Sequence, residues 1–179
     1  LVDQLRAANV ALEMHSYTDE LTGLANRRAL FKHLSSMFPR EREQQRNLLM
    51  IFIDLDDFKA INDRFGHQCG DSFLVQIGER LKAHIRQGDL VGRLGGDEFL
   101  VVGTELDTLQ QQSFVATLRQ ALCGVYFLGE HRINYPGASF GITEVNPQVL
   151  DVESALRAAD DAMYQDKKSP RRDSFLNID

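Results

Sequence analysis

Two acidic clusters stand at positions where a folded sheet displays functional groups. Asp54 directly follows the apolar run 48–53, and Asp97 and Glu98 follow a pair of glycines. A strand end and the tip of a Gly-Gly hairpin both lie at the edge of a sheet. If the two strands are neighbours, Asp54 and Asp97 converge, and a divalent cation relieves the repulsion between them. Mg²⁺ prefers such oxygen ligands and shares them with substrate phosphates. Taken alone, each cluster is more often a solvated strand cap.

Basic residues near the C-terminus are candidates for binding those phosphates. Lys167, Lys168, Arg171 and Arg172 follow the last apolar-periodic segment. The ordinary explanation is that cations at the end of a helix complement its macrodipole. The sequence contains neither G-x-G-x-x-G nor G-x-x-x-x-G-K-[ST]. Any nucleotide is therefore held by metal and side chains rather than by a glycine-rich loop.

Asn62 and Asp71 form a third candidate group. A carboxylate accepts hydrogen bonds from the N1–H and the exocyclic amine of guanine together, and an amide donates to O6 or N7. The pair could therefore read a guanine edge. The competing interpretation is that Asp71 caps the N-terminus of a helix and that Asn62 lies in a turn. These two residues alone favour the competing interpretation.

Composition excludes several classes of protein. The chain has 179 residues, with 20 Lys and Arg against 26 Asp and Glu, and a net charge of −6. This length fits one domain, and the acidic balance argues against a nucleic-acid or anionic-membrane binder. Cys69 and Cys123 form no Cys-x-x-Cys pair, so we expect neither a disulfide framework nor a zinc site. We therefore expect the protein to work in a reducing compartment. The longest apolar run, 48–53, is too short to cross a bilayer. Because the sequence starts at Leu1, we expect it to be a piece of a longer protein.

The elements that must position these residues follow from periodicity and turn signals. We expect helices over 1–15, from Asn26 as N-cap toward Phe38, around Phe58 and Ile61 to near Gly66, from near Asp71 to Gly88, over 109–123, and from near Asp151 to Pro170. Pro39 ends the second helix, and 40–47 is a polar connector. We expect strands over 48–53, 90–94, 99–102, 125–128 and 138–145, with a polar loop containing Pro136 and Gly137 between the last two.

Tandem hairpins exclude a purely parallel wound sheet. We therefore expect an α+β sandwich with a mostly antiparallel central sheet of about five strands, flanked by helices. The first helix carries Leu1, Leu5, Ala8 and Leu12 at alternating spacings of four and three. This short heptad-like stripe is consistent with a helix packed on its own domain, or with the end of a coiled coil that joins an upstream sensor.

The separate signals coincide in one family pattern. RLGGDEF at 93–99 resembles the signature of the GGDEF family, the diguanylate cyclases, and so does FIDLDDFKAIND at 52–63 with the FGH and GD that follow. DELTGLANRR at 19–28 and ADDAMY at 159–164 resemble the opening and closing motifs of the family. The resemblance divides the chain into a connector helix (1–15), a catalytic domain (16–172) and a tail (173–179).

The resemblance implies a fold similar to nucleotidyl cyclases and the polymerase palm, and a nucleotidyltransferase activity. Such enzymes condense two GTP into cyclic di-GMP, a bacterial second messenger linked to biofilm formation, and release two pyrophosphates. Two Mg²⁺ or Mn²⁺ ions per half-site would be held by Asp54, Asp97 and the Leu55 carbonyl. Asp97 would act as base for the 3′-hydroxyl, supported by Glu98. Because each domain binds one GTP, a homodimer is implied, with an upstream sensor and a catalytic domain in the cytoplasm.

Further residues are carried over by position. Those implied in substrate binding are Asn62 and Asp71 on guanine, His67 in the pocket, and Lys167 and Arg171 on the β- and γ-phosphates. Arg86 and Asp89 match the spacing of the family's inhibitory Arg-x-x-Asp motif, which implies inhibition by cyclic di-GMP. The chain departs from the family in having Pro170 before Arg171, where a glycine is usual.

Two alternatives stay open at this point. One is a non-catalytic domain that binds GTP or cyclic di-GMP and signals through contacts; the intact 95–99 signature disfavours it. The other is a related cyclase with relaxed purine choice, which the carboxylate of Asp71 disfavours.

Overall fold

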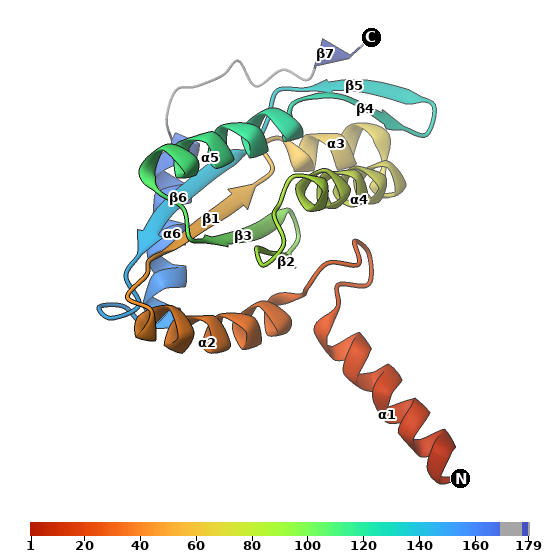
Figure 1. Cartoon of the computed structure of the whole chain (residues 1–179). Coiled ribbons are helices and arrows are strands. Elements are labelled where there is room, and N and C mark those ends of the chain that lie inside the picture. The colour runs from red at the N-terminus through yellow and green to blue at the C-terminus, as the bar shows by residue number, and fades with distance from the viewer. Residues whose placement is uncertain (169–176, 179) are drawn as a thin grey trace.

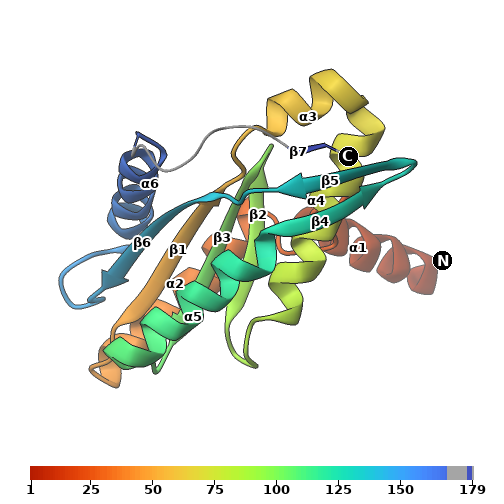
Figure 2. The same ribbon diagram turned by 90° about the horizontal axis from the view of Figure 1, so that it is seen from above.

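Four antiparallel strands form the central sheet of the computed structural model, which describes residues 1–168 and 177–178. Their order is β2-β3-β1-β6. The strands are β1 (Leu48–Asp54), β2 (Leu90–Gly95), β3 (Glu98–Thr104) and β6 (Ser139–Val145). The helices are α1 (Val2–Tyr17), α2 (Arg27–Glu43), α3 (Phe58–Phe65), α4 (His67–Ala83), α5 (Thr108–Leu122) and α6 (Val152–Lys168). Helices α2 and α6 cover one face of the sheet, and α3, α4 and α5 lie on the other (Figures 1 and 2).

Strand β1 is apolar throughout because both of its faces are covered. Successive side chains of a strand point to opposite faces. Accordingly, Leu49, Ile51 and Ile53 belong to the core shared with α4 and α5. Leu48, Met50 and Phe52 belong to the core shared with α2 and α6. The predicted buried strand is confirmed, and it delivers Asp54 at its end.

A second, smaller sheet lies beside the central one. It consists of β4 (Gly124–Leu128), β5 (His131–Tyr135) and β7 (Asn177–Ile178). The predicted polar loop after β4 is therefore wrong in part, because residues 131–135 pair with β4 as a hairpin. Ile133 and Tyr135 alternate with polar residues and are buried, which is a strand pattern. This hairpin does not join the central sheet, which has four strands rather than about five among the described residues.

Helix α2 continues through a proline that was predicted to end it. Asn26 is the N-cap, as expected, and its side chain accepts from the backbone N–H of Ala29 at 2.9 Å. The helix runs through Pro39 to Glu43, into the segment predicted as a connector. A proline inside a helix loses one hydrogen bond and crowds the preceding turn. However, Glu41 is buried and pairs with Arg46 at 2.9 Å, and Arg42 donates from Nε to the carbonyl of Pro147 at 2.8 Å. These tertiary contacts hold the last turn in helical form.

Helix α6 lies unusually close to the edge strand β6. A Cβ atom built on Gly141 would lie 2.2 Å from the backbone nitrogen of Met163 and 2.4 Å from the carbonyl of Ala159. Only a glycine permits this approach. The close packing fixes the height of α6 over the sheet and, with it, the position of the basic residues at the end of the helix. The predicted stop of this helix at Pro170 lies outside the described residues.

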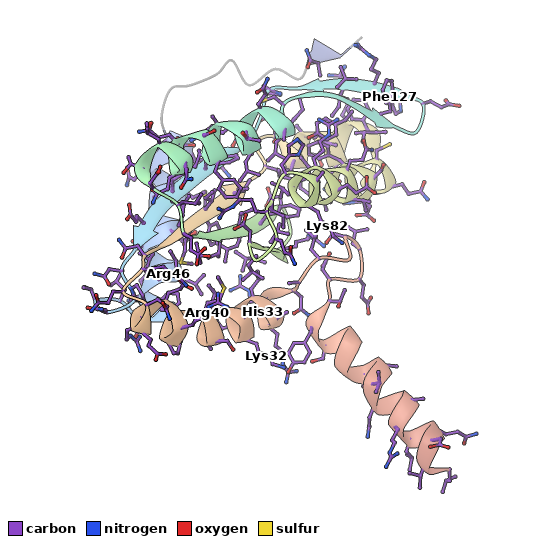
Figure 3. All side chains as sticks on the ribbon, in the orientation of Figure 1. Lys32, His33, Arg40, Arg46, Lys82 and Phe127 are labelled. Atoms are coloured by element: carbon purple, nitrogen blue, oxygen red, sulfur yellow. The ribbon has the colours of Figure 1, made fainter. Side chains whose placement is uncertain are left out.

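Helix α1 projects away from the rest of the molecule (Figures 1 and 3), and near its C-terminal end the ring of Tyr17 contacts Lys32 of α2. Leu5 and Leu12 are 59% and 65% exposed. The interpretation of a helix packed on its own domain is therefore wrong for this stripe. The coiled-coil interpretation stays a prediction. Within the described part of the chain, no helix has the length and apolar character needed to span a membrane.

Candidate active site

The tip of the β2–β3 hairpin is docked against the end of β1. The β1–β3 ladder ends with Asp54 opposite Glu98. Beyond it, the backbone N–H of Leu55 donates to the carbonyl of Asp97 at 3.1 Å. The two glycines before Asp97 have φ values of 143° and 50°, and this freedom lets the tip turn within two residues. The fold therefore brings the two predicted acidic clusters together.

Asp54 is a buried carboxylate with incomplete compensation of its charge. It is 6% exposed, and its Oδ1 atom lies 3.1 Å from Nζ of Lys167. Apart from this charged contact, no hydrogen-bond donor of the described residues reaches Oδ1. Burial and the nearby charge of Asp97 raise the pKa of Asp54 to about 6, although Lys167 acts in the opposite direction. The end of β1 thus carries an excess of negative charge.

The donors at this edge suit a hard divalent cation. Asp54, Asp97 and the neighbouring backbone carbonyls are all oxygen donors, which Mg²⁺ prefers. Among the residues that the structure describes, no three Asp, Glu, His or Cys side chains gather into a preformed metal cage. Mg²⁺ is commonly held by one or two carboxylates and completed by substrate phosphates. The Oδ1 atom of Asp54 is the acceptor that such a cation would satisfy, so the residues fit this kind of site.

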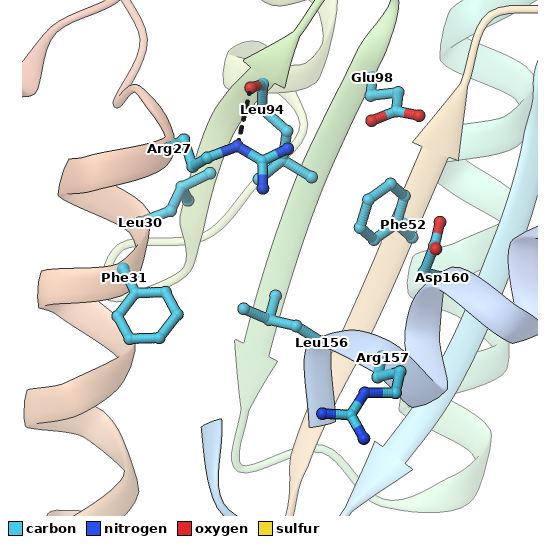
Figure 4. A pocket seen from close by; sticks show the side chains of 9 residues that line it. All are labelled: Arg27, Leu30, Phe31, Phe52, Leu94, Glu98, Leu156, Arg157 and Asp160. Atoms are coloured by element: carbon cyan, nitrogen blue, oxygen red, sulfur yellow. Dashed lines mark hydrogen bonds between the residues drawn. The ribbon is translucent and has the colours of Figure 1, made fainter. Parts of the chain in front are cut away.

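Glu98 faces a cleft of about 440 Å³ between α2 and α6. In Figure 4, Arg27 and Arg157 stand around the same apolar floor as Glu98 and Asp160. Burial and the charge of Asp160 raise the pKa of Glu98, and Arg27 opposes this effect. Arg27 also donates from Nε to the carbonyl of Leu94 at 3.4 Å, which ties α2 to the hairpin. The cleft gives a polar molecule access to the Glu98 side of the tip.

Helices α3 and α4 bring the guanine-reading candidates together. A Cβ atom on Gly70 would lie 1.8 Å from Oδ1 of Asn62, so the Asn62 side chain rests on α4 one residue before Asp71. The alternative that Asp71 caps a helix and Asn62 lies in a turn is wrong. Asn62 lies within α3, not in a turn. Gly66 alone joins the two helices, so α4 begins at His67 and Asp71 lies inside it rather than at its N-cap. Asp71 and His67 are both exposed.

One of the two predicted phosphate ligands is placed by the structure. Lys167 lies in the last turn of α6 and reaches Asp54. Burial lowers the pKa of Lys167, but the hydrogen bond to Asp54 and the negative charge of that residue outweigh burial and raise the pKa overall. The ammonium group is therefore firmly charged beside the acidic edge. Arg171 lies outside the described residues, and so does Pro170 before it.

Arg86 and Asp89 lie at the opposite end of the β2–β3 hairpin from its tip. Strand β2 has six residues between them and the tip, which corresponds to roughly 20 Å. The two side chains form a bidentate pair, with Nη2 to Oδ1 at 2.8 Å and Nε to Oδ2 at 3.1 Å. Arg86 also donates to the carbonyl of Thr104 at 2.7 Å. The structure therefore separates this pair from the acidic edge, as a second site requires.

Several contacts around the site were not predicted. Arg93 donates to both carboxylate oxygens of Asp19 at 3.0 and 3.2 Å and to the carbonyl of Gly96 at 2.9 Å. This bridge fastens the opening motif to the hairpin tip. The Ser139 hydroxyl donates to Asp56 at 2.6 Å and holds the turn after β1. Asp19 and Arg93 lie in the quoted motifs, but 74 residues separate them, and no local pattern indicates their pairing.

Comparison with known sequences identifies relatives over nearly the whole chain. The sequence model of the family described as "Diguanylate cyclase, GGDEF domain" matches residues 16–173. The diguanylate cyclase DgcP of Escherichia coli K12 is 51% identical over 176 residues, which cover 98% of this chain and 52% of that protein. The chain thus spans about half the length of this relative.

Solved structures show the same fold. The diguanylate cyclase SiaD of Pseudomonas aeruginosa, determined in complex with its activator SiaC, has a TM-score of 0.80 at 32% identity, over 94% of this chain and 65% of that one. The GGDEF domain of DgcB from Caulobacter crescentus, in complex with c-di-GMP, has a TM-score of 0.79 at 25% identity, over 87% of this chain and 92% of that one. These similarities confirm the predicted fold class.

Proposed function

Because the chain belongs to the diguanylate cyclase GGDEF domain family, we propose that it condenses two GTP molecules into cyclic di-GMP and releases two pyrophosphates. In each of two equivalent steps, a 3′-hydroxyl oxygen forms a bond to an α-phosphorus, and the bond from that phosphorus to pyrophosphate breaks. Asp97 takes the proton of the hydroxyl, and Glu98 supports it from the adjacent position. The observation that carries the proposal is the docking of the hairpin tip on the end of β1.

Asp54, Asp97 and the Leu55 carbonyl are proposed to hold two Mg²⁺ or Mn²⁺ ions in each half-site. The buried Oδ1 atom of Asp54, which has no donor besides Lys167 among the described residues, supports this assignment. When bound, such ions offset the charge of the leaving pyrophosphate and acidify the attacking hydroxyl. The contribution of the chain itself is rigidity: the ligands stand on a paired strand and on a tip that is hydrogen-bonded to it.

Asn62 and Asp71 are proposed to read the guanine edge, with His67 at the wall of the pocket. The contact of Asn62 with Gly70 supports this, because it places the amide beside the start of α4, where Asp71 stands. The proposed ligands of the β- and γ-phosphates are Lys167 and Arg171. The position of Lys167 beside Asp54 supports its assignment, because a triphosphate bound through metal ions at Asp54 would lie within its reach.

Catalysis is proposed to require a homodimer, because one domain binds one GTP and a second must present the nucleophile. The cleft beside Glu98 leaves the hairpin tip accessible for that encounter. The exposed Leu5 and Leu12 of α1 offer a stripe on which two copies could pair under an upstream sensor domain. Since GTP is the substrate, we expect the catalytic domain to face the cytoplasm.

Cyclic di-GMP is proposed to act also as an inhibitor that binds Arg86 and Asp89. The GGDEF domain of DgcB was solved with this ligand. In the present chain, a guanidinium can stack on guanine and chelate it, and a carboxylate can accept from its N–H groups. The bidentate contact keeps the two residues together; Arg86 is 45% exposed, whereas the Asp89 side chain is 1% exposed, so Arg86 is the member of the pair that meets a ligand first.

The deciding experiment incubates a forced dimer with GTP and Mg²⁺ and separates the products by chromatography. We expect cyclic di-GMP and pyrophosphate in a ratio of one to two. Asp97→Asn should abolish product formation and leave the thermal unfolding profile intact. Asp161→Asn is a matched control, because it makes the same change at an exposed position on α6.

Other outcomes would decide between the alternatives. GTP binding without any product in the forced dimer would refute the enzyme proposal in favour of a binding domain. Turnover of ATP at the rate of GTP would refute the guanine assignment of Asn62 and Asp71. Product formation by Asp97→Asn at the wild-type rate would refute the proposed base.

A further inference from the structure

Asp166 stands where the helix dipole disfavours it. It lies in the last turn of α6, two residues before the end at Lys168. The C-terminal end of a helix carries partial negative charge, which favours cations there and disfavours carboxylates. Nevertheless, the Asp166 side chain is only 10% exposed. A carboxylate in this position must be stabilised by groups outside its own helix.

Those groups come from β6 and α5. The backbone N–H of Phe140 donates to Oδ2 of Asp166 at 2.8 Å. Because β6 is an edge strand of the central sheet, an N–H group on its outer side has no carbonyl of a neighbouring strand to bond to. Arg119 Nη1 lies 3.8 Å from the same oxygen, and its guanidinium lies over the Phe140 ring, 4.5 Å from the centroid. Asp166 therefore joins α6 to β6 and to α5.

This junction lies beside the active site on both the helix and the sheet. Along α6, Asp166 is followed at once by Lys167. Along the sheet, Phe140 is next to Ser139, which pairs with Asp54 in the β1–β6 ladder. Lys167 Nζ lies 3.1 Å from Asp54 Oδ1. A lysine has a long and flexible stem, so its reach toward one point depends on how firmly the turn that carries it is held.

We propose that Asp166 is a positioning residue that holds Lys167 in place for the β- and γ-phosphates of the nucleotide. This inference rests on the proposed function, because it takes Lys167 as a triphosphate ligand. Arg119 contributes to the same positioning, since its positive charge offsets the negative charge of Asp166. The contact of Gly141 with α6 sets the distance between the helix and the sheet, and the hydrogen bond of Asp166 to Phe140 holds the last turn at that distance.

The test measures nucleotide binding by calorimetry with Mg²⁺ and the whole chain. The probes are 3′-deoxy-GTP, which lacks the nucleophile and cannot condense, and GMP, which lacks the β- and γ-phosphates. We expect Asp166→Ala to weaken 3′-deoxy-GTP binding about tenfold, the effect of one charge-assisted contact, and GMP binding by less than about twofold. Asp166→Asn should recover part of the loss, because an amide oxygen still accepts from Phe140.

A double-mutant comparison isolates the action through Lys167. In a Lys167→Ala background, Asp166→Ala should weaken 3′-deoxy-GTP binding no further. Asp161→Ala removes an exposed carboxylate from the same helix and should bind both probes like the wild type. If Asp166→Ala does not fold, as judged by circular dichroism, Arg119→Gln takes its place with the same pair of probes.

The outcomes separate the inference from the function beneath it. Equal weakening of both probes by Asp166→Ala would show a merely structural role and overturn the inference. Loss of 3′-deoxy-GTP binding in Lys167→Ala alone, with wild-type binding in Asp166→Ala, would also overturn it but leave the proposed function standing. Wild-type binding in Lys167→Ala would instead refute the phosphate role of Lys167 itself.

Discussion

Replacing Gly70 by alanine should alter nucleotide selectivity without unfolding the protein. The added Cβ would lie 1.8 Å from Oδ1 and 2.9 Å from Cγ of Asn62. Both separations are below 3.0 Å, a limit that real Cβ contacts essentially never pass. Because the backbone of α4 is held by its own hydrogen bonds, the Asn62 side chain must swing away. The residue proposed to donate to guanine then leaves its position.

The size of the effect follows from one lost hydrogen bond. A neutral hydrogen bond contributes about 0.5–1.5 kcal/mol, which is roughly a 2- to 12-fold change in affinity. The fold should survive, because alanine inside a helix is favoured over glycine by about 1 kcal/mol. That gain offsets part of the cost of moving a half-buried amide. We therefore expect a clear loss of selectivity, with a small change in melting temperature.

The assay compares the binding of 3′-deoxy-GTP and 3′-deoxy-ATP by calorimetry. The ratio of the two affinities should fall about 2- to 12-fold in Gly70→Ala. Gly78→Ala is the matched control, because it lies in the same helix and its Cβ would meet only carbons of Leu24 and Thr22, at 3.3 Å or more. An unchanged ratio in folded Gly70→Ala, or the same fall in Gly78→Ala, would refute the reasoning.

Four further predictions test other parts of the molecule. Asp97→Asn should lower cyclic di-GMP formation by at least about 100-fold, and chelation of divalent cations by EDTA should stop it until Mg²⁺ is restored; turnover in EDTA would contradict the metal assignment. Arg86→Ala should raise the concentration of cyclic di-GMP needed for half-inhibition, and an unchanged inhibition curve would sink the second site. Burial raises the pKa of Asp19, but hydrogen bonds from Thr22 and the charge of Arg93 outweigh it and hold the pKa below 3.8. Its stabilising effect is therefore complete above that pH and is lost as the pH falls through the lower, folded-state pKa. Asp19→Asn should melt below the wild type at pH 7, and the difference should shrink toward pH 2; a difference independent of pH would contradict this.

Local patterns predicted most of the elements. The apolar run 48–53 and the Gly-Gly tip predicted a buried strand and a hairpin, and both are confirmed. The strand 131–135 was missed because only two of its five residues are apolar. It pairs in the second sheet, outside the central one, and such a short alternation of apolar and polar residues is a weak signal. The helix that passes through Pro39 was mispredicted because burial of Glu41 and the hydrogen bond from Arg42 to the carbonyl of Pro147 outweigh the proline. Arg42 and Pro147 are 105 residues apart, so no local pattern indicates this contact.

The candidate site was predictable only as far as single residues. Asp54 and Asp97 were expected to converge if their strands are neighbours, and the β1–β3 pairing supplies that condition. The motifs named Asn62, but only the packing of α3 on α4 shows why Gly70 precedes Asp71. No sequence pattern predicted a role for Asp166, since an acidic residue near the end of a helix becomes informative only when its partners are known.

The sequence by itself determined the residue types, their order and the local geometry that carries them. Oxygen donors follow a strand, a glycine pair makes the tip, and basic residues end the last helix. Only the tertiary structure decided which of these groups meet. Lys167 reaches Asp54, Arg93 holds Asp19 and Asp166 holds Phe140 because strand order and helix packing bring distant segments together. Periodicity reports the face of an element that is buried, but the choice of partner depends on how whole elements pack.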